Sequence, residues 1–222
     1  MTSNDLLDSY WSHYIMLEKE FMATMHYVKL DIENYEVYSD AYAKLLLQIG
    51  SEIDVVSKET CKLINPSFND ESMDKYLPIL SGDTDFSSTI VKLINYPIRL
   101  EPWNDLETQY NQMPGIIWWK AYNKVKHKRM NNVIINGKSK ESYKFANLKN
   151  TLYSLGGLYH LLLHTYYLLL KNEGKGKESP LPGSRLFKLE GPLWNNVHFP
   201  FDIRLYIDDK GTLIMETSTM PY

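Results

Sequence analysis

The segment from Leu152 to Leu170, "LYSLGGLYHLLLHTYYLLL", restricts the fold of this chain strongly, because it contains no charged residue. In and around it, apolar residues recur at steps of three and four. They are Phe145, Leu148, Leu152, Leu155, Tyr159, Leu162, Tyr166 and Leu169. This spacing predicts one long helix from about Lys140 to Lys171 that packs nearly parallel or antiparallel to its neighbours.

Two adjacent glycines, Gly156 and Gly157, interrupt this helix. Each glycine costs about 1 kcal/mol relative to alanine in the interior of a helix. We therefore expect a neighbouring helix to approach closely at this point and to compensate for that cost.

The same segment is nearly long enough to cross a bilayer. It contains, however, His160, His164, Ser154 and Thr165, which are costly at bilayer depth, and its apolar spacing begins among lysines. We expect a buried helix rather than a membrane span, and hence no membrane partner.

Other helices are expected in the first 172 residues from apolar spacing, capping residues and prolines. Ser39 is a plausible N-cap, and Asn65-Pro66 is a plausible stop, because the residue before a proline disfavours the helical conformation. The expected helices are Asp5–Leu30, a helix that starts after Ser39 and reaches Ile64, Asp85–Asn95 and Pro114–Arg129, with a weaker segment at Asp70–Leu80 and residues 96–103 extended.

After Lys171 the composition changes to the polar, glycine- and proline-rich stretch "NEGKGKESPLPGS". Beyond it, two strand-like runs flank Asp209-Lys210-Gly211, which is a hairpin signal. The sequence predicts a mainly α fold, with a helical bundle domain at 1–172, a linker at 173–184 and a small β-rich appendage at 185–222.

The single cysteine, Cys61, excludes an internal disulfide framework and a cysteine-rich zinc site. The N-terminus has no basic start followed by an apolar run, so we expect a cytoplasmic protein. His160 and His164 have a spacing that zinc-binding helices use, but no third ligand and no HExxH pattern accompany them. Glycine-rich phosphate loops and dinucleotide motifs are absent as well, so we expect neither a metal nor a cofactor.

The charge is distributed unevenly. The chain has a net charge of −3, but the segment 120–149 holds nine lysines and arginines against one acid, Glu141, so it is +8 and the remainder is −11. The basic residues are Lys120, Lys124, Lys126, Lys128, Arg129, Lys138, Lys140, Lys144 and Lys149. One interpretation is a patch that holds a phosphate backbone. The other is a solvated corner whose acidic partners come from elsewhere in the fold.

The helix expected at 114–129 has two faces. Trp118, Ala121, Tyr122 and Val125 fall on one side, which should be the core side, whereas Lys120, Asn123 and His127 fall nearly opposite, flanked by Lys124 and Lys128. A histidine can exchange protons with an RNA 2′-hydroxyl or a leaving oxygen, an asparagine can orient it, and lysines can stabilise the charge of the transition state. The alternative is a surface histidine without a catalytic purpose.

Two further side chains are candidates for a supporting role. Glu52 lies at the margin of the apolar stripe of the second helix and could orient a histidine or arginine across the bundle, although a surface glutamate is the commoner case. Arg99, in "PIRLEPW", could swing toward the basic site.

The bundle, the helix with "YNKVKH" and the long following helix that opens with "FAN" resemble the HEPN superfamily of bacterial toxin–antitoxin, abortive-infection and CRISPR-associated proteins. The resemblance implies metal-independent RNA cleavage, a homodimer and a protein partner such as an antitoxin. The family's motif is an arginine, four to six intervening residues and a histidine. Here no arginine stands at that distance before His127; Asn123 lies four residues before it, and Arg129 follows it.

Three hypotheses follow for the function of the chain. In the first it is an RNA-binding, HEPN-like protein in bacterial stress or phage defence, and His127 cleaves RNA with Asn123 orienting it and Arg129 in place of the missing arginine. Phosphate would then be held by Lys120, Lys124, Lys126, Lys128, Lys138, Lys140 and Lys144. In the second it is a non-catalytic RNA or protein scaffold on the same fold, and in the third a regulatory protein that docks an acidic partner.

Overall fold

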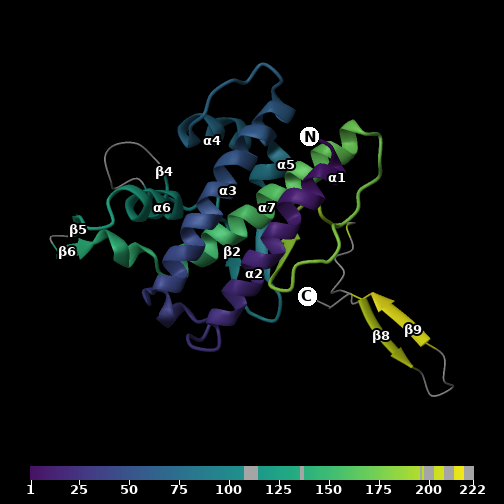
Figure 1. Ribbon diagram of the computed structural model, residues 1–222. Helices are drawn as coiled ribbons and strands as arrows, with labels where there is room; N and C mark the ends of the chain where they lie inside the picture. Colours follow the sequence, from purple (N-terminus) through teal and green to yellow (C-terminus); the bar gives the residue numbers. More distant parts are fainter. Residues whose placement is uncertain (108–114, 136–137, 196, 198–202, 208–212, 218–222) are drawn as a thin grey trace.

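The computed structural model describes residues 1–107, 115–135, 138–195, 197, 203–207 and 213–217, and for several of the strands it describes the backbone only. The fold is mainly helical with small antiparallel sheets, as the sequence predicts. Within the described residues, the helices are α1–α7 and the strands β1–β9 (Figure 1).

The helix α7, Leu148–Asn172, runs through the middle of the molecule (Figure 1) and is buried on all sides along most of its length. The helix α3, Asp40–Ile64, packs along it. The predicted long helix is therefore confirmed, but it begins at Leu148 rather than near Lys140. Asn147 is its N-cap and accepts a hydrogen bond from the Asn150 backbone, whereas residues 138–145 form a strand and a 3-10 turn.

The close approach expected at the two glycines is also present. A Cβ atom on Gly156 would lie 3.2 Å from Leu100 Cδ1, and one on Gly157 would lie 3.3 Å from Trp118 Cζ2. The Trp103 indole also donates a hydrogen bond to the Gly157 carbonyl over 3.2 Å. The neighbours are thus the strands β1 and β2, the turn at 102–104 and the Trp118 ring, not a whole helix packed alongside, and only part of the stretch 96–103 is extended as predicted.

The N-terminal helical run consists of α1, Ser3–Leu6, a π-helical turn η1, Leu7–Trp11, and α2, Ser12–Thr24. The helix predicted to reach Leu30 stops at Thr24. The Thr24 hydroxyl donates to the Phe21 carbonyl, and the next amides bond three residues back instead of four, which closes the last turn. A 3-10 turn, η2, follows at Ile32–Asn34.

The second helix of the sequence prediction is confirmed as α3. The Ser39 hydroxyl caps it by accepting from the Tyr42 backbone, and its C-cap Asn65 has an extended conformation before Pro66. The helix α4 follows at Met73–Gly82, somewhat later than the expected Asp70–Leu80.

The prediction of a helix at Asp85–Asn95 is wrong. Only a short helix α5, Thr84–Ser87, forms, and the strand β1, Ile90–Leu93, follows it. This run is rich in β-branched residues, and its burial alternates as on a strand. Its partners are β2, Arg99–Leu100, and β7, Phe187–Glu190, both antiparallel, in the order β2-β1-β7.

The helix α6, Ile117–His127, is shorter than the expected Pro114–Arg129. Its start follows β4, Gly115–Ile116, which pairs with β3, Leu106–Glu107, and Pro114 lies outside the described residues. The strands β5, Asn132–Ile135, and β6, Lys138–Glu141, then form a hairpin that leads into η3, Ser142–Phe145.

The predicted C-terminal hairpin is confirmed as β8, Ile203–Ile207, paired with β9, Leu213–Thr217. Its expected turn at 209–211 lies outside the described residues. The strand β7, by contrast, belongs to the sheet that packs on α7, so residues 187–190 are joined to the helical part of the chain. No helix in the described part of the chain combines the length and the hydropathy that a membrane span requires.

Candidate nucleic-acid interface

The inner face of α6 is held firmly in the core. Trp118, Ala121, Tyr122 and Val125 are buried, which confirms the predicted core face. The Trp118 indole donates to the Pro102 carbonyl over 2.7 Å and meets the Trp103 ring edge to face. The tryptophan is therefore a structural anchor for the helix and offers no surface for stacking on a base.

Several polar side chains of α6 line a groove of about 400 Å³ that lies between α6, α3 and α4. Lys120, Asn123 and Lys126 line this groove, as do the carboxylates Asp54, Glu71 and Asp74. Burial raises the pKa of Asp54, while the charge of Lys126 opposes that rise. Because carboxylates share the groove, it is a poorer place for a phosphate than the basic residues alone predict.

His127 lies at the C-terminal end of α6 and is exposed. Among the described residues, none forms a hydrogen bond or an ion pair with its imidazole. Asn123 is one turn away on the same side of the helix but does not hold the ring. Two of the side chains predicted for catalysis, Asn123 and His127, are thus one helical turn apart, and no described residue fixes the imidazole.

Arg129 is turned toward a different neighbour. Its guanidinium lies 4.8 Å from the centre of the Tyr143 ring, and the Tyr143 hydroxyl in turn donates to Asp40. These contacts hold Arg129 against η3, which Tyr143 in turn joins to α3. The predicted replacement of the family's arginine has no geometric support in this conformation and stays a prediction.

Beyond α6, basic and aromatic side chains alternate on a surface that we call the basic surface. Lys124 and Lys140 lie over the Phe145 ring, at 3.9 and 4.9 Å from its centre, and Lys144 lies 5.8 Å from that of Tyr38. The basic surface consists of Lys124, Lys128, Arg129, Lys140 and Lys144 with Tyr38, Tyr143 and Phe145.

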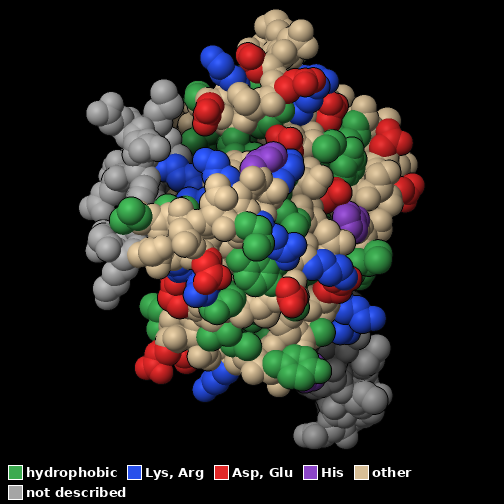
Figure 2. All heavy atoms as spheres, turned by 60° about the vertical axis from the view of Figure 1, so that its left-hand side comes forward, with side chains coloured by type: hydrophobic (Ala, Val, Ile, Leu, Met, Phe, Trp, Pro, Cys, Tyr) green, Lys and Arg blue, Asp and Glu red, His purple; other side chains and the backbone are tan. Residues whose placement is uncertain are grey.

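Some of these charges have acidic partners. Lys140 pairs with Glu36 at 2.6 Å, and Lys144 pairs with Glu141 at 3.3 Å. Lys128 and Arg129 have no acidic partner among the described residues, and both are exposed. Figure 2 shows basic, acidic and hydrophobic side chains interspersed on the face to which α6 and the hairpin belong. Lys138 lies on β6, but its side chain is outside the described part of the structure.

The two supporting candidates face other parts of the fold. Glu52 does meet a histidine across the bundle, but this is His13 of α2, 3.2 Å away, and not His127. Arg99 pairs with Glu190 of β7 at 2.7 Å, and Lys92 pairs with the same carboxylate. Arg99 is thus fixed to the sheet β2-β1-β7, and the expected swing toward the basic site is not seen.

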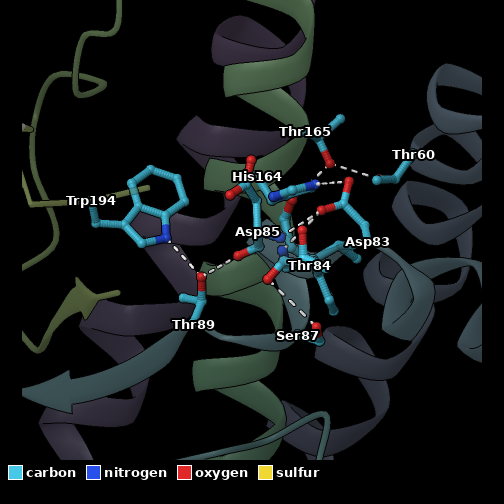
Figure 3. A network of polar contacts seen from close by, with 11 residues as sticks. Thr60, Asp83, Thr84, Asp85, Ser87, Thr89, His164, Thr165 and Trp194 are labelled. Carbon is cyan, nitrogen blue, oxygen red and sulfur yellow. Dashed lines mark hydrogen bonds and ion pairs between the residues drawn. The ribbon is translucent and has the colours of Figure 1, made fainter. Parts of the chain in front are cut away.

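The histidine pair of α7 is buried rather than open to a ligand. His164 lies 3.4 Å from Asp83, whose carboxylate also caps α5 (Figure 3). The neighbouring His164 side chain and the hydrogen bonds from the α5 backbone lower the pKa of Asp83 to about 2. In the described part of the chain, no group of three or more His, Cys, Asp or Glu side chains has an arrangement that could hold a metal ion.

Sequence reasoning missed the aromatic half of the basic surface and the carboxylates of the groove. Tyr143 and Phe145 lie in "SYKFAN", next to lysines, so an aromatic–basic alternation was visible there. Asp54, Glu71 and Asp74 come from segments distant in sequence from α6, and no local pattern connects them to it.

Comparisons of the chain with models of protein families, with curated proteins and with solved structures find no match.

Proposed function

We propose that this chain is an RNA-binding protein and that the basic surface is where the nucleic acid binds. The observation that carries the proposal is the pair Lys128 and Arg129, exposed at the end of α6 without acidic partners among the described residues, with Arg129 over the Tyr143 ring. Proteins that bind single strands combine cations along the backbone with aromatic side chains in this way.

The choice of RNA over DNA and a HEPN-like arrangement of the helices both come from the resemblance of the sequence. That resemblance rests on "YNKVKH" and on the long helix that opens with "FAN". The homodimer and an antitoxin-like protein partner belong to the same proposal. The mass of the purified protein in solution, measured by light scattering, tests the dimer directly.

Binding is tested with a short labelled single-stranded RNA and a DNA of the same sequence, at a series of salt concentrations. We expect affinity to fall with salt, and the double variant Lys128→Ala/Arg129→Ala to bind more weakly. For every phosphate that the variant no longer neutralises, the slope of log K against log salt should become shallower by about 0.7 on a single strand. Lys75→Ala, which removes an exposed lysine on α4, is the matched control and should bind as the wild type does.

Binding without salt dependence, or equal binding by the double variant and the wild type, would contradict the proposal. The basic surface would then fit the third hypothesis, a site for an acidic protein partner. Equal affinity for DNA and RNA would contradict the proposed specificity for RNA but would still support binding of nucleic acid.

RNA cleavage is a second candidate because the His127 imidazole is exposed, with Asn123 one turn away. In it the histidine takes a proton from a 2′-hydroxyl, so no metal is needed. The same RNAs incubated in EDTA provide the test. Cutting that is abolished in His127→Ala while binding persists supports this candidate, and binding without cutting by the wild type supports the non-catalytic scaffold.

A further inference from the structure

A second hollow lies on a different part of the molecule from the basic surface. It is a groove of about 860 Å³ between α2, the turn that follows it, Tyr96 and the segment 182–185. We call it the α2 groove. Its walls are largely apolar and include Ile15, Met22, Met25, Leu30 and Tyr96. A volume of this size falls within the range of small-molecule sites, roughly 300–1,000 Å³.

Basic side chains also line the α2 groove. Lys19, Lys29 and Arg185 are exposed there, together with His26. None of the four has an ion-pair partner among the described residues. The chain as a whole has a net charge of −3, so this group of basic side chains around an apolar hollow is a local excess of positive charge that could attract an anionic ligand.

The acidic residue of the groove, Glu18, is already engaged. It is buried, with 2% of its surface exposed, and it accepts hydrogen bonds from the Tyr14 and Ser184 hydroxyls. The backbone amides of Arg185 and Leu186 donate to it as well. Because its oxygens are bound by these donors, Glu18 fixes the segment 184–186 and does not pair with the basic side chains of the groove.

The groove therefore combines apolar walls with positive charge. Two methionines, Met22 and Met25, line it, and methionine adapts readily to the shape of an apolar ligand. An inorganic anion would leave the apolar walls unused, and a neutral hydrocarbon would leave the cations unused. A ligand that satisfies both has an anionic head and an apolar tail.

We propose that the α2 groove binds a single-chain amphipathic anion from solution, of the long-chain carboxylate class. The tail lies against Ile15, Met22, Met25 and Leu30, and the head is held by Lys29 and Arg185. Apolar side chains here line a hollow, which suits a single amphiphile better than a bilayer surface. This proposal is independent of RNA binding, because it uses α2 and residues 182–185 rather than α6, β5–β6 and η3.

The test uses decanoate as the probe and the full-length protein labelled with carbon-13 in its methionine methyl groups. NMR spectroscopy then reports on Met22 and Met25 directly, while Met130, which is 93% exposed outside the groove, is the internal control. Decanoate should shift the Met22 and Met25 signals to saturation and leave that of Met130 unchanged. Decanol supplies the tail without the charge, and butyrate supplies the charge with little tail, so both should bind more weakly.

The double variant Lys29→Gln/Arg185→Gln should bind decanoate about tenfold more weakly and no longer prefer decanoate over decanol. Both side chains are exposed and have no ion pair among the described residues, so the variant should fold. Lys171→Gln, at an exposed position on α7 that does not line the groove, is the matched control and should bind as the wild type does.

Three results would overturn the proposal. The first is the absence of a shift at Met22 and Met25 with decanoate, and the second is equal affinity for decanol. The third is a response only to anionic phospholipid vesicles, or only when the protein self-associates, which would assign the groove to a membrane surface or to a second copy of the chain.

Discussion

The imidazole of His160 is fully buried and stacked on the Phe86 ring, with 4.2 Å between the ring centres. Neither ring nitrogen has a hydrogen-bond partner among the described residues. Burial, and next the neighbouring His164, hold the pKa of His160 well below its usual value of 6.5. The folded chain therefore keeps this histidine neutral at a pH where the unfolded chain protonates it.

This difference predicts a loss of stability in mild acid. Above pH 6.5 the ring is neutral in both states, whereas below it only the unfolded state gains the proton, so the free energy of unfolding falls as the pH falls. The slope from one proton is about 1.4 kcal/mol per pH unit. His160→Leu should lose stability less steeply than the wild type between pH 6.5 and 5, as measured by urea unfolding.

The histidines outside this pair are common to both proteins and cancel in the difference. The lowered pKa of Asp83 affects stability in a more acidic range. The stability that it contributes is fully present above pH 3.8 and is lost as the pH falls toward 2. Parallel curves for His160→Leu and the wild type over this range would show that the buried ring takes up its proton in the folded state as well.

Single side chains were predictable from the sequence where one helix determines their environment. Helical spacing alone places Trp118 and Val125 in the core and Asn123 on the opposite face. Helical spacing cannot show which residues of other elements lie next to the exposed face of a helix. The carboxylate of Asp54, which lines the same groove as Asn123, and the ring of Tyr143, against which Arg129 lies, come from other elements, so their effect on the candidate site is visible only in the fold.

At the scale of elements, α6 is positioned by its packing against α3. A Cβ atom on Gly50 would lie 2.3 Å from Cδ2 of the Tyr122 ring, so the ring occupies the space that any other side chain would need. Because ring atoms near the helix backbone cannot move aside cheaply, α6 as a whole would have to shift.

The variant Gly50→Ala tests this packing. Its higher helix propensity should add about 1 kcal/mol of stability, but the clash should cost about 1–3 kcal/mol and displace α6. We expect a net loss of stability in thermal unfolding and, on the proposed function, a weaker affinity for RNA, since the end of α6 contributes Lys124, Lys128 and Arg129 to the basic surface. Gly82→Ala, where a Cβ atom would meet nothing within 4 Å, is the control and should cost little. A stabilised Gly50→Ala variant would mean that the ring moves freely.

Elements were predictable where apolar spacing and caps agree, as in α3 and α7. The segment 85–95 shows why others were not. Its apolar residues fit a helix locally, but β1 finds its partner β7 nearly a hundred residues further on, roughly as far as a typical domain is long. The β-branched residues Ile90 and Val91 favour a strand only weakly, and nothing in the segment identifies its distant partner, although pairing with that partner decides the conformation.

On the scale of the whole molecule, residues 182–194 join the C-terminal part of the chain to the helices. The Trp11 indole donates to the Pro182 carbonyl over 2.9 Å, and the Trp194 indole donates to the Thr89 hydroxyl over 2.8 Å. Between them, β7 pairs with β1 along its whole length, and Glu18 accepts bonds from the backbone of residues 185 and 186. The first of these contacts falls at Pro182, inside the linker that composition predicts at 173–184, and the others fall in the segment predicted as a separate appendage.

Two truncated chains distinguish a boundary at 173–184 from one after β7. A chain of residues 1–178 lacks β7 and leaves the buried Glu18 without most of its donors, which costs about 1–3 kcal/mol for each unsatisfied group. We expect it to unfold at a much lower denaturant concentration than the full chain, if it folds at all. A chain of residues 1–197 keeps β7, Trp194 and the Glu18 contacts, and it should unfold cooperatively near the midpoint of the full chain, as followed by tryptophan fluorescence. Equal stability of the two truncated chains would instead support a helical domain that ends near residue 172.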